Sequence, residues 1–241
     1  MLVLALDTTT RGGSLAIVDD DVVVDERSGD AARTHAERLP AAIVELLAAH
    51  QRAIADVDLF AVASGPGSFT GMRIGIATIQ GLALVRSTPV VSVSALDALG
   101  QIASRNAAPG ALVGAWIDAH RRDVFSALFK VSAAPLFESD RLSEVDPPAV
   151  GDPAAIIARW RAAAGDDRIT VVGDGAALFA DAIGREAPAW AVVPPPLLAG
   201  AIGRLAAARA RRGETIDAAG LRPLYIRRPD AEVARDRRVA D

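Results

Sequence analysis

Short apolar runs alternate along the chain with clusters of polar and turn-forming residues, and this pattern predicts an α/β fold. Over roughly the first hundred residues, the apolar runs predict strands at 2–6, 14–18, 22–24, 59–63 and 90–93. Apolar residues at helical spacing predict helices at 70–86, at 95–104 and after residue 34. The predicted order of elements is therefore β-β-β-α-β-α-β-α.

The first helix has a clear start signal. Thr34 and Glu37 have the spacing of a capping box, in which a hydroxyl and a carboxylate satisfy backbone N–H groups at the helix start. The apolar stripe of this helix then consists of Leu39, Ile43, Leu46 and Leu47. Pro40 lies inside the stripe and has no N–H to donate, so the helix either kinks at Pro40 or effectively starts there.

The second half of the chain repeats the opening pattern after a breaker-rich segment at 106–110. When Asp118 is aligned with Asp7, both segments read as an apolar strand, an aspartate, a polar turn and a second apolar strand. The elements expected after that are a helix at 154–164, a strand at 169–172, a helix that begins at 173–175 and a helix at 199–211.

This internal duplication predicts the actin-like, ribonuclease H-like α/β architecture, in which two subdomains each hold a mixed sheet and packed helices. The expected division is an N-terminal subdomain at 1–108, a C-terminal subdomain at 109–226 and a charged, frayed tail at 227–241.

In such an architecture each half offers a loop after its first strand that can face a nucleotide phosphate. Asp7, Thr8 and Thr9 form one such loop, and Asp118 lies at the corresponding place in the second half. An aspartate at the end of a strand can orient a metal-bound water, while hydroxyl and N–H groups receive phosphate oxygens. The same residues can instead satisfy the backbone donors of tight turns, and neither loop holds a lysine that would clamp a phosphate.

The glycine-rich segment 65–71 is a second candidate phosphate loop. Gly65, Gly67 and Ser68 belong to it, and it opens directly onto the start of a helix, where backbone N–H groups attract anions. The segment matches neither the P-loop nor the dinucleotide fingerprint, so a purely structural capping loop explains it equally well. Gly173, at the start of a later helix, is a third candidate of this kind.

The helix at 70–86 is apolar nearly all round, and Arg73 and Arg86 are its only charged residues. Gly75 and the other small residues on one face allow close approach of a neighbouring helix. Two interpretations follow, a core helix covered within its own chain or a face that contacts another protein, and the second is favoured. On that interpretation Gly75→Leu blocks assembly and leaves the isolated fold intact.

Composition excludes several classes of protein. The 241 residues include no cysteine, so disulfides, thiolate zinc sites and a catalytic thiol are excluded. A hydrophobic share of 51% excludes a disordered chain, and a net charge of −4 argues against binding of nucleic acid by the chain alone. The apolar run at the N-terminus stops at Leu6 without a positive flank, so we expect no signal peptide, no membrane span and a cytoplasmic location.

The histidines and serines offer no catalytic or metal motif. His35, His50 and His120 lack the spacing of a metal-binding pair, and the G-x-S-x-G nucleophile elbow is absent.

Several long motifs resemble the bacterial TsaB (YeaZ) family. They are ALDTTTRGGSLAIV, THAERLPAAI, SGPGSFTGMRIGIATIQGLA, IDAHRRDVFSALF and RPLYIRRP, and together they run through most of the chain. The resemblance implies a non-catalytic partner of a TsaD-type catalytic paralogue. With a TsaE-type ATPase, these proteins install threonylcarbamoyl on the adenosine 3′ of the anticodon in tRNAs that read codons starting with A.

The resemblance also implies that ATP and a metal belong to the partner subunits, that tRNA binds through the complex, and that this chain needs no cofactor of its own. Ala95 and Leu99 stand where the catalytic paralogue has two metal-binding histidines, and neither can ligate a metal. The helices at 35–49 and 70–86 are implied to form a four-helix contact between paired subunits. The expected interface residues are His35, Leu39, Ile43, Leu47, Met72, Gly75, Ile76 and Ile79.

Other functions remain open at this point. The main alternative is an ATP-dependent transferase or hydrolase that acts by itself through Asp7, Asp118 and the 65–71 loop. A metal-dependent peptidase is disfavoured because the ligands are missing. The same helical face can also form a homodimer when the partner is absent.

Overall fold

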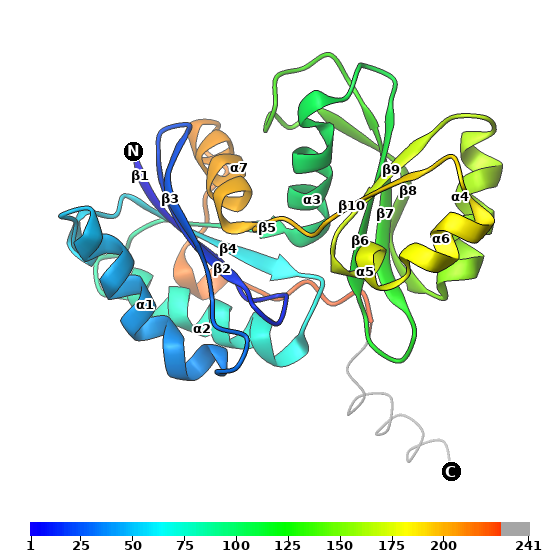
Figure 1. The fold of residues 1–241 in the computed structure, drawn as a ribbon. Helices are drawn as coiled ribbons and strands as arrows, with labels where there is room; N and C mark the ends of the chain where they lie inside the picture. Colours follow the sequence, from blue (N-terminus) through cyan, green and yellow to red (C-terminus); the bar gives the residue numbers. More distant parts are fainter. Residues whose placement is uncertain (228–241) are drawn as a thin grey trace, which may run out of the picture.

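The computed structural model describes residues 1–227, and these form two five-stranded mixed sheets, one from each half of the chain (Figure 1). The first sheet has the order β3-β2-β1-β4-β5, with strands β1 (Leu2–Asp7), β2 (Ser14–Asp19), β3 (Val22–Ser28), β4 (Leu59–Gly65) and β5 (Val90–Ser94). The second sheet has the order β10-β9-β6-β7-β8, with strands β6 (Leu112–Asp118), β7 (Val124–Val131), β8 (Leu142–Gly151), β9 (Ile169–Val172) and β10 (Ala191–Val193).

The strand pairing is the same in both halves. β1 pairs antiparallel with β2 and parallel with β4, just as β6 pairs antiparallel with β7 and parallel with β9. Asp7 and Asp118 are the last residues of the two equivalent central strands. The predicted duplicated, actin-like architecture is therefore confirmed.

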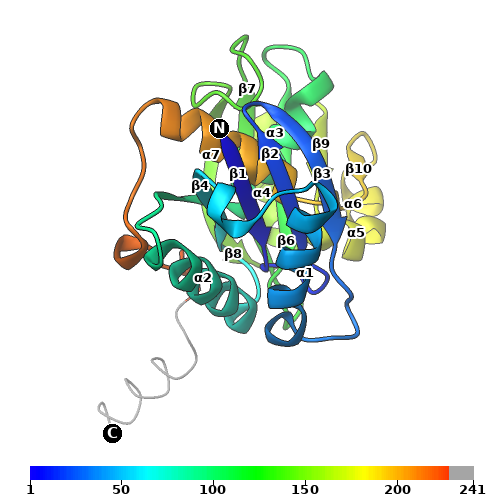
Figure 2. The same ribbon diagram turned by 90° about the vertical axis from the view of Figure 1, so that its left-hand side faces the viewer.

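Helices cover both faces of both sheets. The outer face of the first sheet carries α1 (His35–Ala49) and α2 (Phe69–Leu84), which lie next to each other (Figure 2). Between the two sheets lie α3 (Ala95–Ala103) and α7 (Ala199–Arg211), and the far side of the second sheet carries α4 (Pro153–Ala164), α5 (Asp174–Leu178) and α6 (Ala180–Glu186). Single 3₁₀ turns occur at Ile54–Asp56, Ser104–Asn106 and Ala218–Gly220.

Burial on both faces explains why the strands read as continuous apolar runs. In β1, Val3 and Ala5 point into the core between the sheets, whereas Leu2, Leu4 and Leu6 pack under α1 and α2. A sheet covered by helices on both sides has no solvent-facing row of side chains, so apolar and polar residues do not alternate along its strands.

The start of α1 follows the sequence prediction. Thr34 is the N-cap, and both hydrogen bonds of its capping box with Glu37 are present. The helix begins at His35 and continues through Pro40, so the alternative in which Pro40 starts the helix is wrong. Pro40 is exposed on the outer side of α1, where a missing N–H donor leaves no buried polar group without a partner.

The end of the described chain returns to the first half. Helix α7 packs across β1, β2 and β4, and the Leu224 N–H donates to the Ser64 carbonyl at 2.7 Å. A division of the chain at residue 108 therefore separates the two sheets but not the helices packed on them. Of the predicted tail at 227–241, only Arg227 lies within the described residues, and none of the helices in residues 1–227 is long and apolar enough to cross a membrane.

Candidate functional site

A cleft of about 610 Å³ lies where the two halves meet, and it gathers the loops that the sequence pointed to. Its walls include four segments: the turn after β1, the loop before α2, the turn after β6 and the start of α5. Its polar lining includes Thr9, Thr10, Arg11, Arg33, Thr34, His35, Ser68, Thr70, Asp118, His120 and Asp174. The predicted phosphate loops of the two halves are thus brought together in space.

Asp7 does not face this cleft, because its carboxylate is used within its own turn. The side chain is buried, and its Oδ1 accepts hydrogen bonds from the Thr9 N–H at 2.8 Å and the Thr9 hydroxyl at 2.6 Å. The Thr10 hydroxyl lies 3.3 Å from the other carboxylate oxygen. Burial raises the pKa of Asp7, and the hydrogen bonds from Thr9 oppose that shift. These contacts match the tight-turn interpretation of Asp7.

The glycines of the 65–71 loop let this loop pack closely on the turn after β1. A Cβ at Gly67 would lie 2.5 Å from the Thr9 carbonyl oxygen, and Gly67 has a φ of +151°. Ser68 N-caps α2, since its hydroxyl accepts from the Gly71 N–H at 3.1 Å, and its own N–H donates to the Thr9 carbonyl at 2.8 Å. Two N–H groups that an anion cradle would use therefore already have partners, as the capping-loop interpretation requires.

Asp118 and Asp174 are the two carboxylates that line the cleft. The Asp118 N–H donates to Asp174 Oδ1 at 3.1 Å, and Asp118 Oδ1 accepts from the His120 N–H at 2.8 Å. Burial raises the pKa of Asp174. Gly173 does not line the cleft, because it packs against the Trp116 carbonyl in a left-handed conformation with φ of +119°.

Asp174 and His120 belong to the cleft but were missed as site residues. Asp174 is the second residue after the strand predicted at 169–172, and its place just beyond the end of a strand was the available signal. Within residues 1–227, no group of three or more His, Cys, Asp or Glu side chains could hold a metal ion.

The residues predicted to face a partner are buried inside this chain. Six of the apolar residues in this set are at most 5% exposed: Leu39, Ile43, Leu47, Met72, Ile76 and Ile79. Except for Met72, which contacts the Gly65 loop, all of them belong to the core that α1 and α2 form with the first sheet. The prediction of an exposed face made of these side chains is therefore wrong. A helix that covers a sheet turns its large apolar residues toward that sheet, and only its other side remains open.

Gly75 also faces inward. A Cβ at this position would overlap Thr8 Oγ1, a buried hydroxyl in the turn after β1. The close approach that this glycine permits is thus between α2 and its own sheet. The prediction that Gly75→Leu leaves the isolated fold intact is therefore wrong.

In the second half of α2, the side that faces solvent is made of small and apolar residues. This outer face of α2 consists of Ala77, Gly81, Leu84 and the C-cap Val85, with Leu84 66% and Val85 81% exposed, whereas the exposed residues of the first half are Thr70 and Arg73 besides Phe69. A Cβ at Gly81 would meet nothing within 4 Å. On α1, Val44 is 55% exposed.

His35 joins the start of α1 to the turn after β1. Its Nε2 lies 3.1 Å from the Thr10 carbonyl and its Nδ1 lies 2.6 Å from an Arg38 nitrogen. Donation by Arg38 to Nδ1 requires the neutral ring with its proton on Nε2. Burial, together with the nearby Arg38 charge, lowers the pKa of His35. His35 is therefore only partly available to a partner.

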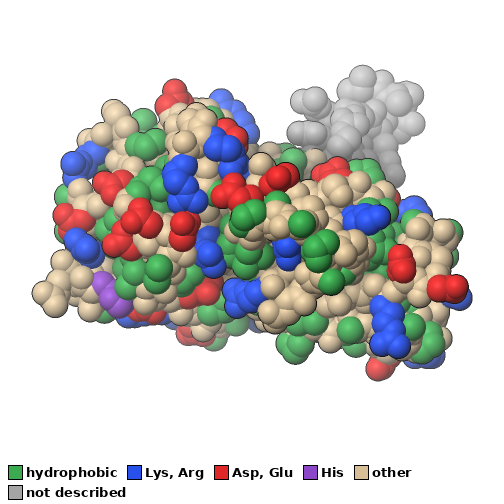
Figure 3. Space-filling view, turned by 90° about the horizontal axis from the view of Figure 1, so that it is seen from above, with side chains coloured by type: hydrophobic (Ala, Val, Ile, Leu, Met, Phe, Trp, Pro, Cys, Tyr) green, Lys and Arg blue, Asp and Glu red, His purple; other side chains and the backbone are tan. Residues whose placement is uncertain are grey.

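Acidic, basic and apolar side chains are interspersed over the face drawn in Figure 3. This face has no continuous basic field of the kind that binds nucleic acid through its phosphates. The mixture agrees with the net charge of −4.

The chain matches a family model described as tRNA N6-adenosine threonylcarbamoyltransferase, TsaD, over residues 28–142. The tRNA threonylcarbamoyladenosine biosynthesis protein TsaB of Escherichia coli is 35% identical over 130 residues, which are 54% of this chain and 55% of that protein. This match thus spans about half the length of the relative. An uncharacterized protein of Mycobacterium tuberculosis is 32% identical over 95% of this chain and 93% of its own length.

Solved structures extend the likeness to nearly the whole chain. A crystal structure from Pseudomonas aeruginosa, of an uncharacterized protein with similarity to peptidase YeaZ, has a TM-score of 0.76 at 30% identity and covers 94% of this chain and 99% of its own. The activator of 2-hydroxyisocaproyl-CoA dehydratase from Clostridium difficile, with bound ADPNP, has a TM-score of 0.51 at 11% identity and covers 93% of this chain and 100% of its own. This second likeness concerns the fold alone.

Proposed function

The chain belongs to the TsaB (YeaZ) family, and on this premise we propose that it is the non-catalytic scaffold subunit of a tRNA-modifying complex. That complex transfers threonylcarbamoyl to the adenosine 3′ of the anticodon in tRNAs that read codons starting with A. The catalytic subunit is a TsaD-type paralogue, and a TsaE-type ATPase and the tRNA join through the complex. A cytoplasmic location belongs to the same proposal.

The outer face of α2 is the observation that carries the scaffold role. No charged residue occurs between Arg73 and Arg86, and in that part of the helix the exposed side is a stripe of small and apolar side chains. Exposed apolar area of this kind is unfavourable in water unless another surface covers it. Gly81, in the middle of the stripe, permits a second helix to approach closely.

The state of the catalytic positions supports a non-catalytic role. Ala95 and Leu99, at the places of the paralogue's metal-binding histidines, are buried apolar residues at the start of α3. The Asp7 carboxylate is held by Thr9 and Thr10, and therefore is not oriented toward a bound metal or nucleotide. In this proposal the chain needs no cofactor, and ATP and the metal are bound by its partners.

The test is the solution mass of the chain alone and mixed with the TsaD-type paralogue of its organism, measured by light scattering on a sizing column. The chain should form a one-to-one complex at the expense of any homodimer. Gly81→Leu should weaken that complex at least tenfold, because a leucine side chain fills the space into which the partner helix fits.

Gly184→Leu is the matched control. Gly184 is also an exposed helical glycine with open space around it, but it lies on α6 on the far side of the second sheet. This variant should assemble normally, and both variants should unfold at the wild-type temperature or above it. A Gly81→Leu protein that assembles as tightly as wild type contradicts the proposed surface. Tight Mg-ATP binding by the isolated chain in calorimetry would favour instead an ATP-dependent enzyme that acts by itself.

A further inference from the structure

One histidine fastens the start of α1 to the turn after β1. His35 Nε2 lies 3.1 Å from the Thr10 carbonyl oxygen, and His35 Nδ1 lies 2.6 Å from an Arg38 nitrogen. Because Arg38 donates to Nδ1, the ring is neutral and its Nε2–H donates to Thr10. His35 also lines the cleft between the two halves, and nothing in the proposed scaffold role uses its contacts.

Arg38 is a buried cation that depends on this ring. Its side chain is 6% exposed, and a Cβ at Gly29 would overlap its guanidinium group. Within residues 1–227, Arg38 forms no ion pair with a carboxylate. It donates to the Gly12 carbonyl and to His35 Nδ1, and its Nε has no partner there. The ring nitrogen is therefore one of only two acceptors for a buried charge, and its loss is costly.

Other charged groups surround the pair at a greater distance. They are Asp30 and Arg33 in the loop before α1, Glu37 in its first turn, Asp7 and Arg11 in the turn after β1, and Asp118, His120 and Asp174 among the residues that line the cleft. Asp30 and Asp7 favour the charge on Arg38. In the described part of the chain no carboxylate contacts the His35 ring, and burial together with the Arg38 charge lowers the pKa of His35.

A proton on Nδ1 is incompatible with the contact to Arg38. Both nitrogens are then donors, and two positive groups face each other where one acceptor is needed. Arg38 is enclosed by the backbone of Gly12 and Gly29, whereas His35 is half-buried in the wall of the cleft. The ring is therefore the group that moves, and the open space beside it is the cleft.

We propose that His35 is a proton-sensitive latch on this cleft. In its neutral form the ring joins the start of α1 to the turn after β1. When protonated, the ring leaves Thr10 and Arg38 and turns into the cleft. The wall formed by the loop before α1 then opens, and the cleft gains a positive charge, so that pH controls both its shape and its electrostatics.

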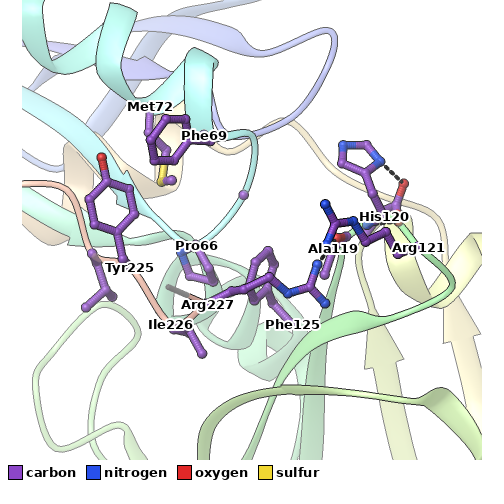
Figure 4. A pocket seen from close by; sticks show the side chains of 13 residues that line it. Pro66, Phe69, Met72, Ala119, His120, Arg121, Phe125, Tyr225, Ile226 and Arg227 are labelled. Carbon is purple, nitrogen blue, oxygen red and sulfur yellow. Dashed lines mark hydrogen bonds and ion pairs between the residues drawn. The ribbon is translucent and has the colours of Figure 1, made fainter. Parts of the chain in front are cut away.

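The other two histidines have the opposite kind of partner. His50 Nε2 lies 2.9 Å from Asp25 Oδ2, and His120 Nδ1 lies 3.3 Å from Asp118 Oδ2, the contact drawn as a dashed line from His120 in Figure 4. Protonation strengthens a contact with a carboxylate and breaks one with a guanidinium group. Of the three histidines in the sequence, only His35 is thus arranged to open on protonation.

The full chain labelled with ¹³C and ¹⁵N at histidine reports all three rings in one set of NMR spectra. At pH 7.5 the His35 ring should carry its proton on Nε2. It should also show a nuclear Overhauser effect to Gly13, because a Cβ at Gly13 would lie 2.9 Å from the ring Cε1. As the pH is lowered, this effect should be lost in step with protonation of the ring. The contacts of His50 and His120 should persist over the same range.

Arg38→Met removes the charge next to the ring. In this variant His35 should become protonated at a higher pH than in wild type, and its contact with Gly13 should survive protonation. Arg33→Met is the matched control. Arg33 also lies at the start of α1 and lines the cleft, but it donates to the Glu37 carbonyl at 3.3 Å and not to the ring. This control should titrate as wild type does.

His35→Gln gives a second measurement that does not depend on the Arg38 variant. Glutamine keeps an N–H donor for the Thr10 carbonyl and takes up no proton. Because the pKa of His35 is lower in the folded state, the folded protein binds fewer protons there than the unfolded chain. The stability of wild type relative to His35→Gln in urea should therefore be constant above the unfolded-state pKa of about 6.5 and fall as the pH drops below it.

Three results would overturn the proposal. One is a His35 ring that becomes protonated while its contact with Gly13 persists. The second is a ring that stays neutral until the protein unfolds. The third is a stability difference between wild type and His35→Gln that does not change between pH 7.5 and pH 5. The first two need only the wild-type protein.

Discussion

At the scale of single residues, the two aspartates that the duplication makes equivalent have different surroundings. Asp7 is buried, and its carboxylate accepts hydrogen bonds from its own turn. Asp118 instead lines the cleft, where its carboxylate accepts from the His120 N–H and its own N–H donates to the Asp174 carboxylate. The equivalence of their positions in the two sheets therefore does not extend to their chemistry. A carboxylate that accepts several hydrogen bonds within a turn stabilises that turn and has little capacity for a ligand.

Asp7→Asn tests this structural role through pH. Burial raises the pKa of Asp7, so the folded state holds its proton at a higher pH than the unfolded state does. The contribution of Asp7 to stability is therefore fully present below the unfolded-state pKa and is lost as pH rises through the folded-state pKa. At pH 7.5 the asparagine variant should be at least as stable as wild type, because asparagine cannot carry the buried negative charge.

Urea unfolding of both proteins between pH 5 and pH 7.5 checks this expectation. The stability of wild type relative to Asp7→Asn should rise as the pH falls. The difference between the two proteins separates Asp7 from Asp97, another buried acid with a raised pKa, whereas Glu26 and Asp174 interact with the Asp7 charge and contribute to the same difference. A difference that is constant, or that changes in the opposite direction, contradicts the argument.

At the scale of secondary-structure elements, α2 has two different faces that both contain glycine. Gly75 packs on Thr8 at the first sheet, and Gly81 is open to solvent. The two glycines are six positions apart in one helix, so their intrinsic effects on helix stability are similar. A comparison of them therefore separates packing from helix propensity.

Gly75→Ala should destabilise the protein by about 2 kcal/mol, because the new methyl group overlaps the Thr8 side chain in a core that cannot expand freely. Gly81→Ala should stabilise it by about 0.5–1 kcal/mol, since alanine favours the helix and meets nothing there. Thermal or urea unfolding of the two variants measures both effects. Equal changes of the same sign would show that the orientation of α2 is different from the one described.

At the scale of the whole molecule, the segment 221–227 connects the two halves at the side opposite to α7. Its Leu224 N–H bonds to Ser64 at the end of β4, and its Arg227 bonds to Ala119 and Asp123 in the turn after β6. Two sheets that share only a helical interface would otherwise depend on α3 and α7 for their relative position.

Arg227→Ala should therefore loosen this connection. Loss of charge-assisted hydrogen bonds to a half-buried arginine should reduce global stability by about 1–2 kcal/mol. The amide of Leu224 should exchange with solvent faster, because the segment then opens locally. Arg222→Ala is the control, since among residues 1–227 Arg222 bonds only to nearby backbone carbonyls, those of Ala219 and Leu221. If Leu224 exchanges at the wild-type rate in Arg227→Ala, the segment does not hold the halves together.

Most helices and strands could be predicted from the sequence, because the signals that define them lie within a few neighbouring residues. The strand at 169–172 and the helix at 199–211 have the predicted bounds, and the capping box of Thr34 works through residues three apart. Strands β8 and β10 were not predicted. β8 contains two prolines and is an edge strand, and β10 has only three residues, so both lack a clear apolar period.

The sequence alone also indicated the internal duplication and the family resemblance. It further indicated that the turn after β1, the 65–71 loop and Asp118 belong to one site. The position of α7 and the orientation of α2 came only from the three-dimensional packing. A helix that is apolar nearly all round has no sequence signal for which side meets its own sheet, because the choice depends on strands far away in the chain. For α2 the sheet takes the side with Gly75, Ile76 and Ile79, since their small and large side chains fit the turn and strands beneath them. The side with Gly81 and Leu84 is consequently the one that faces solvent.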